Sequence, residues 1–164
     1  MNGADKVPYN LPELLLANNR WVFLCEGEKD CSTLAKAGFC ATTFGGSSDL
    51  PKDSLAYFKD KKVFILGDFD KPGEKHVIEA YNALSSIASE VRHTWLKEPS
   101  QDKKVNDVTD WFSNGGTVEK LQAQVRDAKG YQELPKNPTN KIYTYDDILQ
   151  MPPPKWLVYD YLLE

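Results

Sequence analysis

The sequence lacks the features that would assign it to a membrane or secreted class. No hydrophobic run approaches the roughly 18 residues that a membrane-spanning helix needs. The first 20 residues contain no basic segment followed by a long apolar core, which a secretory signal would require. We therefore expect a cytoplasmic location and no membrane partner.

Cysteine is scarce, with three residues in a chain of 164, and no two of them are spaced as Cys-x-x-Cys. Cys25 and Cys40 lie in apolar runs, which is typical of reduced cysteines that pack as small core residues. Without a Cys-x-x-Cys pair, the sequence disfavours a zinc site completed by His76 or His93.

Positive charge is also in short supply. The chain has 20 Lys and Arg against 24 Asp and Glu, for a net charge of −4, and its pI is about 5.3. This balance excludes a protein that coats nucleic acid through bulk positive charge. Any contact with nucleic acid must be local or carried by metal ions.

The chain does contain a regular alternation of short apolar runs and helical patterns. Strands are expected at residues 20–27, 39–46, 61–70 and 91–97, and helices at 28–38, 50–60, 73–90, 107–114 and 117–129. Repeated strand, helix and strand with short connections predicts an α/β fold. We expect a sheet of about four mainly parallel strands with helices on both faces.

Two helical stretches carry specific predictions about the core. The first places five apolar residues on one stripe of an amphipathic helix: Val77, Ile78, Tyr81, Leu84 and Ile87. The second contains Trp111 and Phe112 at the start of a short helix. We predict that this aromatic pair packs the helix onto the sheet and does not stack on bases.

Two of the expected strands end in acidic residues. Glu26 follows the first strand, and Asp68 and Asp70 follow the third. Ligands of parallel sheets bind beyond the carboxyl ends of the strands, so the three carboxylates converge if these strands are neighbours. At strand spacing, Asp68 and Asp70 point to the same side. Such hard oxygen ligands suit Mg²⁺ or Mn²⁺ and favour phosphoryl transfer or phosphodiester cleavage.

Each of these motifs also has a simpler interpretation. The segment 70–73 is a good turn sequence, and the acids of segment 26–30 are favoured in the first turn of a helix. Five further residues are candidates for contacting phosphate: Gly45, Gly46, Lys29, Lys71 and Lys75. In the simpler interpretation, the two glycines only form a tight turn and the three lysines only lie on the helix surface.

Three stretches in this order resemble the Toprim domain of DNA primases, topoisomerases and certain nucleases: residues 22–46, 63–84 and 106–117. They are most similar to the form found in phage and mobile-element primase-helicases. The resemblance covers residues 21–128. It implies the Toprim (Rossmann-like) fold and a DNA primase activity, that is, Mg²⁺- or Mn²⁺-dependent nucleotidyl transfer for primer synthesis in DNA replication.

The resemblance also implies roles for individual residues. Glu26 corresponds to a general acid or base that is also an indirect metal ligand, and Asp68 and Asp70 correspond to metal-binding aspartates. Asp107 corresponds to a further metal ligand. Supporting positions are Asp30, Lys29, Gly73 and Asp110. One departure is Phe69, which stands between the two aspartates where a small or polar residue is usual.

The expected domain organisation has four parts: a lead-in at 1–20, a Toprim domain at 21–129, a linker at 130–141, and at 142–164 the start of a truncated RecA-like helicase domain. The resemblance implies a fragment of a longer enzyme with little activity in isolation. In the full-length protein, the expected partners are a single-stranded DNA template, nucleoside triphosphates and the adjoining helicase domain.

Two other functions stay open. A Toprim nuclease would use the same carboxylates to cleave phosphodiesters, and a non-catalytic Toprim-like module would bind DNA or a partner protein. A phosphoacceptor aspartate of the receiver-domain type fits less well, because Glu26 precedes the Asp68–Asp70 pair.

Overall fold

The computed structural model describes residues 7–45, 50–97 and 105–130. The expected linker beyond residue 130, the segment 142–164 and Gly46 lie outside the described residues. Within the described ranges, no helix is both long and apolar enough to cross a bilayer.

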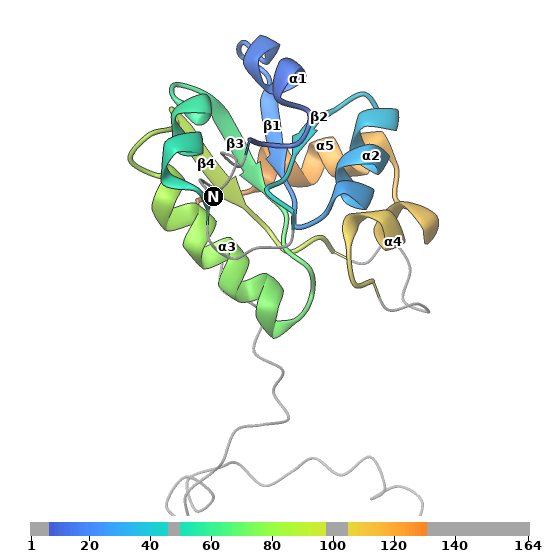
Figure 1. Ribbon diagram of the computed structural model, residues 1–164. Coiled ribbons are helices and arrows are strands. Elements are labelled where there is room, and N and C mark those ends of the chain that lie inside the picture. The colour runs from blue at the N-terminus through green and yellow to red at the C-terminus, as the bar shows by residue number, and fades with distance from the viewer. Residues whose placement is uncertain (1–6, 46–49, 98–104, 131–164) are drawn as a thin grey trace, which may run out of the picture. The chain divides into compact units, whose positions relative to one another are not determined.

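The centre of the fold is a sheet of four parallel strands (Figure 1). The strands are β1 Trp21–Leu24, β2 Cys40–Thr42, β3 Lys62–Ile65 and β4 Glu90–His93, in the spatial order β2-β1-β3-β4. The predicted α/β fold with a four-stranded parallel sheet is therefore confirmed. Because β1 and β3 pair directly, the carboxyl ends of these two strands lie side by side, as the acidic turns require.

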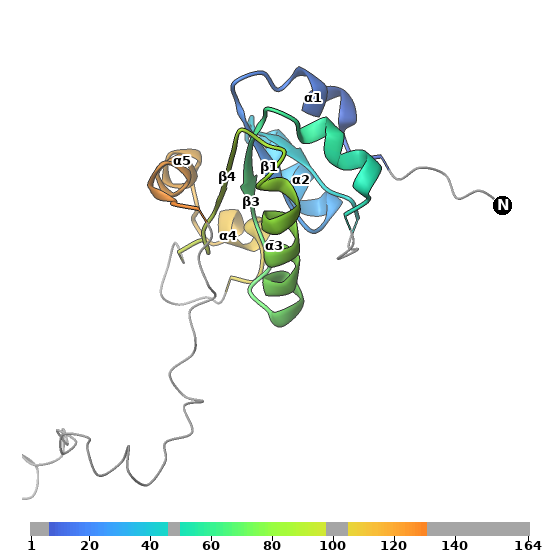
Figure 2. The same ribbon diagram turned by 90° about the vertical axis from the view of Figure 1, so that its left-hand side faces the viewer.

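Helices cover both faces of the sheet. They are α1 Leu11–Leu16, α2 Glu28–Lys36, a 3₁₀ helix at Lys52–Phe58, α3 Lys71–Leu84, α4 Val108–Ser113 and α5 Val118–Asp127. Figure 2 shows α5 and α3 on opposite sides of the strands. The helix expected at residues 50–60 exists as a 3₁₀ helix that begins after Pro51.

Each strand contributes side chains to two separate cores because successive residues point to opposite faces. Phe23 packs in the core that includes residues of α2, α4 and α5, whereas Val22 and Leu24 pack in the core that includes residues of α1 and α3. Burial on both faces explains why β1 is apolar throughout. The predicted core cysteines, Cys25 and Cys40, are buried.

The buried side of α3 differs from the predicted stripe. Ile78 is 39% exposed, and Ile87 lies beyond the end of the helix at Leu84. The prediction was wrong for these two residues. The helix buries a face that includes the small residues Gly73 and Ala80, which allow it to approach the sheet closely. The full buried set is Gly73, His76, Val77, Ala80 and Leu84.

Trp111 is fully buried, as predicted, and anchors the short helix α4. Its indole Nε1 donates a hydrogen bond to the carbonyl of Lys97 at 2.8 Å. Phe112 is half-buried and meets the Trp111 ring edge to face, with centroids 5.1 Å apart. Gly116 lies so close that a Cβ at this position would overlap the Trp111 ring.

This contact predicts that Gly116→Ala destabilises the protein by on the order of 1–3 kcal/mol, because the added methyl group must displace a buried indole. Trp111→Ala should cost on the order of 3 kcal/mol through the cavity that it leaves. Urea unfolding followed by circular dichroism measures both. Gly27→Ala is the control, since its Cβ would meet no atom within 4 Å. Equal effects of the Gly116 and Gly27 variants would contradict the packing role of Gly116.

Candidate functional site

The candidate site lies where β1 and β3 end side by side. The pairing continues one residue beyond β3, because Leu66 N donates to Leu24 O at 2.9 Å. The Glu26 carboxylate then reaches from the turn after β1 to the turn after β3, where its Oε1 accepts a hydrogen bond from Asp68 N at 3.1 Å. The structure thus brings Glu26 and Asp68 together, as their positions after neighbouring strands predicted.

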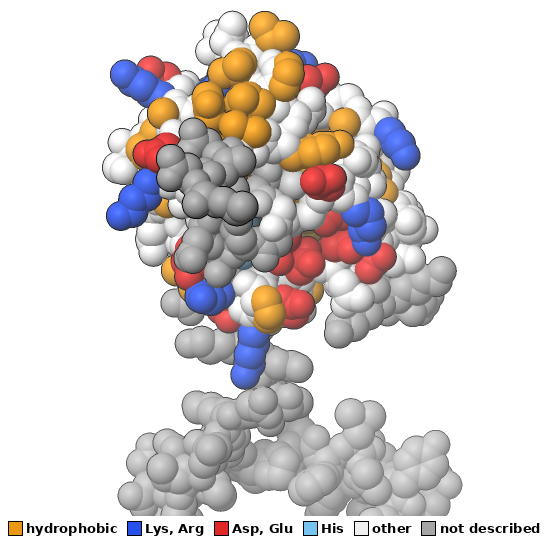
Figure 3. All heavy atoms as spheres, in the orientation of Figure 1, with side chains coloured by type: hydrophobic (Ala, Val, Ile, Leu, Met, Phe, Trp, Pro, Cys, Tyr) orange, Lys and Arg blue, Asp and Glu red, His pale blue; other side chains and the backbone are white. Residues whose placement is uncertain are grey.

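The Asp68 carboxyl group is half-buried in a strongly negative environment. Its pKa is raised to about 7, first by burial and then by the negative charges of Glu26, Asp30, Asp107 and Asp70. Burial and like charges both disfavour the ionised form. On the face shown in Figure 3, acidic side chains gather in the region between α2 and α3. Without a cation, Asp68 therefore keeps its proton up to near neutral pH.

Asp70 occupies a different environment from Asp68. Its side chain is exposed and caps α3, where Oδ1 accepts a hydrogen bond from Gly73 N at 2.7 Å. Because β3 ends at Ile65, the alternation of a strand does not extend to these aspartates. The strand argument for a common direction of Asp68 and Asp70 therefore does not apply, although Asp70 still adds to the negative potential at Asp68.

Two glycines allow α3 to begin directly against the Asp68 turn. A Cβ on Gly73 would overlap the Asp68 carbonyl, and a Cβ on Gly67 would overlap the side chain of Val77. Gly73, a supporting position implied by the resemblance, thus lies directly against the Asp68 backbone. The close approach of α3 also gives a packing reason for Gly67 directly before the first aspartate, since Trp95 lies 3.4 Å from the same position.

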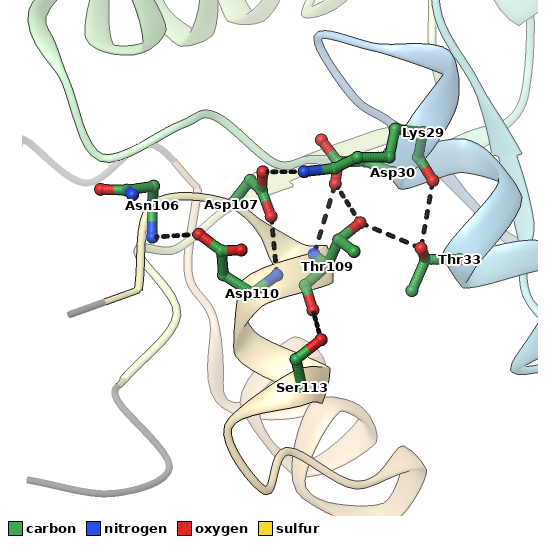
Figure 4. Close-up of polar contacts among 8 residues, drawn as sticks. All are labelled: Lys29, Asp30, Thr33, Asn106, Asp107, Thr109, Asp110 and Ser113. Carbon is green, nitrogen blue, oxygen red and sulfur yellow. Dashed lines mark hydrogen bonds and ion pairs between the residues drawn. The ribbon is translucent and has the colours of Figure 1, made fainter. Parts of the chain in front are cut away.

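Asp107 is held by two partners at the start of α4 (Figure 4). Its Oδ1 accepts a hydrogen bond from Asp110 N at 2.7 Å, and its Oδ2 pairs with Lys29 Nζ at 2.6 Å. The hydrogen bond to Asp107 raises the pKa of Lys29. Asp110 in turn accepts a weak hydrogen bond from Asn106 N at 3.4 Å. Lys29 thus offsets part of the charge beside Asp68.

Asp30 joins α2 to α4 from within the protein. It is 6% exposed, and its Oδ1 accepts hydrogen bonds from Thr109 Oγ1 at 2.6 Å and from Thr109 N at 3.3 Å (Figure 4). Burial raises the pKa of Asp30, while the bonds from Thr109 oppose that rise. Thr33 Oγ1 lies 2.9 Å from Thr109 Oγ1 and extends the link. Sequence reasoning assigned Asp30 a supporting role but missed both threonines, whose partners are 76 or more positions away.

His76, considered from the sequence only as a disfavoured zinc ligand, also lies near the acidic turn. It is buried on α3, and its Nε2 has no hydrogen-bond partner among the described residues. Burial lowers the pKa of His76, and the nearby charges of Glu26 and Glu79 oppose this shift. The imidazole is therefore close enough to the acidic turn for the charge of Glu26 to affect its pKa. No pattern in the sequence distinguished it from a core position.

Of the residues predicted to contact phosphate, Lys29 pairs with an acid of this group, Asp107. The Gly45 N–H donates to Thr43 Oγ1 at 3.0 Å, so the turn itself uses that donor. Lys71 and Lys75 are exposed at the start of α3, and Lys75 Nζ lies 3.5 Å from Glu79 Oε1.

Within residues 7–45, 50–97 and 105–130, no three His, Cys, Asp or Glu side chains are grouped so that they could hold a metal ion as they stand. The donor chemistry nevertheless fits a hard cation. Glu26 and Asp68 supply adjacent carboxylate oxygens, and the raised pKa of Asp68 marks negative charge that the protein leaves uncompensated. The capping bond of Asp70 uses only Oδ1, whereas both carboxylate oxygens of Asp107 already have partners.

Two comparisons with known proteins bear on this arrangement. Residues 21–99 match the family model of the Toprim domain. Among solved structures, the chain is similar to the primase fragment of the bacteriophage T7 primase-helicase protein, with a TM-score of 0.54 and 21% sequence identity. No curated protein sequence matches.

The structural match covers 74% of this chain and 49% of the T7 fragment, so this chain spans about half the length of that relative. At this identity the match reports the fold. The matched family residues begin at the first residue of β1 and include all four strands, Glu26, Asp68 and Asp70. Residues 21–99 of this chain are therefore similar to the Toprim domain family.

Proposed function

We propose that this domain is the metal-binding catalytic core of a DNA primase or primase-helicase, which joins nucleotides during primer synthesis. The observation that carries the proposal is the Asp68 carboxyl group, whose pKa is raised to about 7 beside Glu26 and three further carboxylates. A cluster of like charges at the carboxyl ends of neighbouring parallel strands is unfavourable unless a cation neutralises it.

Asp68 and Glu26 are the residues that would hold the ion, with Asp70 and Asp107 as further ligands. The ion is Mg²⁺ or Mn²⁺, which carboxylate oxygens and substrate phosphates bind together. When bound, it lowers the pKa of an attacking hydroxyl group and stabilises the charge that develops on the leaving phosphate.

The chain itself contributes orientation and proton transfer. Glu26 is oriented by the hydrogen bond from Asp68 N, and its proposed role is to accept the proton of a hydroxyl group bound at the same turn. Lys29, which is 61% exposed, supplies positive charge at the rim. The Asp30–Thr109 bonds fix α4 against α2 and so hold Asp107 at the edge of the site.

The partners of the proposed reaction follow from the same chemistry. The substrates are nucleoside triphosphates and a single-stranded DNA template, and the full-length protein would add a helicase domain after the Toprim domain. The similarity to a primase fragment of a primase-helicase supports this choice. Residues 130–141 and 142–164 would then be the linker and the first part of that domain.

The proposal predicts that Mn²⁺ binds to the isolated chain and that Asp68→Asn/Asp70→Asn weakens binding by at least ~10-fold, because two charged carboxylates become neutral amides. Isothermal titration calorimetry measures the change. Asp53→Asn, an exposed acid on the 3₁₀ helix, is the matched control and should bind Mn²⁺ like the wild type. Equal Mn²⁺ affinity of all three proteins, or no binding by any of them, would reject the site.

The raised pKa of Asp68 predicts how stability depends on pH in EDTA. The folded-state pKa of about 7 lies above the ordinary aspartate pKa of 3.8, so the folded protein holds this proton more tightly than the unfolded chain. The stabilising contribution is complete below pH 3.8 and is lost as the pH rises to about 7. Asp68→Asn should therefore raise the melting temperature more at pH 8 than at pH 5.

Scanning calorimetry at the two pH values measures this difference, and Asp53→Asn should show none. Added Mn²⁺ should raise the melting temperature of the wild type at pH 8 and have a smaller effect on Asp68→Asn. A pH-independent effect of Asp68→Asn would contradict the electrostatic account of this carboxyl group.

In the full-length protein, Glu26→Gln is expected to abolish primer synthesis, because it removes the proton-transfer group. It should retain most Mn²⁺ binding, because Gln keeps a side-chain oxygen and Asp68 and Asp70 stay in place. Primer extension on a single-stranded template and calorimetry measure the two properties. Unchanged synthesis would remove Glu26 from the mechanism. Metal-dependent cleavage of DNA by the wild type, without synthesis, would assign the site to a nuclease.

A further inference from the structure

A cleft lies at the opposite end of the strands from the acidic turns. It has a volume of about 540 Å³ and is lined by the first residues of all four strands, by the loop before β1 and by α5. The lining residues that matter below are Arg20, Trp21, Phe39, Lys62, Arg92 and Arg126.

The register of the sheet explains why polar side chains form the floor of this cleft. Trp21 pairs with Lys62, and Lys62 pairs with Glu90, so the three residues form one row across β1, β3 and β4. Alternation places this row on the same face as Phe23 and Phe64, which belong to the core beneath α2, α4 and α5. Charged residues on that face indicate that the helices leave its amino-terminal end open.

Arg92 is held rigidly in the floor. Its guanidinium group pairs with Glu90, donates to the carbonyl of Arg126 at 3.1 Å, and lies 5.0 Å from the centroid of the Trp21 ring. A guanidinium group over an indole ring is a favourable cation–π contact. These contacts fix a flat surface of Arg92 and Trp21 before any ligand arrives.

The cleft also has an excess of positive charge. Four of its lining residues are cationic, namely Arg20, Lys62, Arg92 and Arg126, and one is acidic, Glu90, which leaves a local charge of +3. The whole chain has a net charge of −4. Glu90 already pairs with Arg92, and none of the other three cations has an ion-pair partner among the described residues. Such a group of unpaired cations favours an anionic ligand.

Aromatic side chains border the same charges. Trp21 and Phe39 are only half-buried, and Phe39 meets Phe23 with ring centroids 5.0 Å apart. Rings and cations together are the combination that binds nucleotides in proteins without base-specific contacts, because every base has a stacking face and every phosphate a negative charge. A volume of about 540 Å³ lies in the range of small-molecule sites.

We propose that this cleft is a second ligand site that binds a nucleoside phosphate, with its base against Trp21 and Phe39 and its phosphate on Arg20, Lys62 and Arg126. The nucleoside phosphate is either a free nucleotide or one unit of a single strand, since both offer the same chemistry. The site is separate from the acidic turns and needs no metal ion, so it does not depend on the proposed catalytic function.

The test uses the whole chain in EDTA, with ATP, the oligonucleotide dT8 and inorganic tripolyphosphate as probes. Each probe is titrated into ¹⁵N-labelled protein while the indole N–H signals are followed by NMR, and the Trp21 signal is assigned with Trp21→Phe. ATP, dT8 or both should shift the Trp21 signal and leave the signal of buried Trp111 unchanged. Binding of dT8 alone would identify a strand as the source of the nucleotide.

Charge reversal locates the phosphate. Arg20→Glu/Arg126→Glu should weaken binding of the nucleotide by at least ~10-fold, because two charged contacts become repulsive. Lys52→Glu/Lys59→Glu changes the net charge equally at exposed positions of the 3₁₀ helix and its end, and should weaken binding less than ~2-fold. Asp68→Asn, at the other end of the strands, should bind the nucleotide as well as the wild type does.

Phe39→Leu, checked for folding by its melting temperature, should weaken ATP or dT8 binding and leave any tripolyphosphate binding unchanged. Three results would overturn the proposal: equal weakening by both double variants, equal affinity for tripolyphosphate and the nucleotide, or no shift of the Trp21 signal with any probe. Failure of Mn²⁺ binding at Asp68 would leave these measurements unaffected, so the two proposals fail separately.

Discussion

The hydrogen bond from the Asp68 N–H to the Glu26 carboxylate is the contact on which the acidic site depends. It exists because β1 and β3 are direct neighbours in the sheet, so the turns that follow them meet. The same turn packs against the start of α3, which the absence of a side chain at Gly73 permits. Strand order, helix start and carboxylate position are thus one linked arrangement.

The cost of this arrangement is concentrated negative charge. Asp68 bears most of it, as its raised pKa shows, while Asp107 is compensated by Lys29 and Asp30 by the bonds from Thr109. Asp70 and Asp107 also cap α3 and α4, where each accepts a hydrogen bond from a helix N–H group. A bound cation would therefore have its largest effect on the charge of Asp68, which is the least compensated member of the group.

The two ends of the same sheet have opposite chemistry. The carboxyl ends carry the acids, as expected for ligand sites of parallel sheets, and the amino ends carry Arg20, Lys62 and Arg92 around a cleft. Both features arise from the parallel register, which places the first residues of all strands at one edge and their following turns at the other. The proposed cation site and the proposed anion site therefore lie at opposite ends of one sheet.

The sequence by itself determined the α/β class, the four strands and the positions of Glu26 and Asp68 directly after two of them, because these follow from local hydrophobic pattern. That the two strands are neighbours was decided by the strand order of the sheet. Tertiary structure decided what depends on distant partners. The face with which α3 packs on the sheet leaves Ile78 exposed, and Asp70 caps α3. The strand register brings residues as far apart as Arg20 and Arg126 together in the basic cleft. Periodicity within one segment contains no information about which surface of a neighbouring segment will cover it, and these contacts therefore could not be read from the chain.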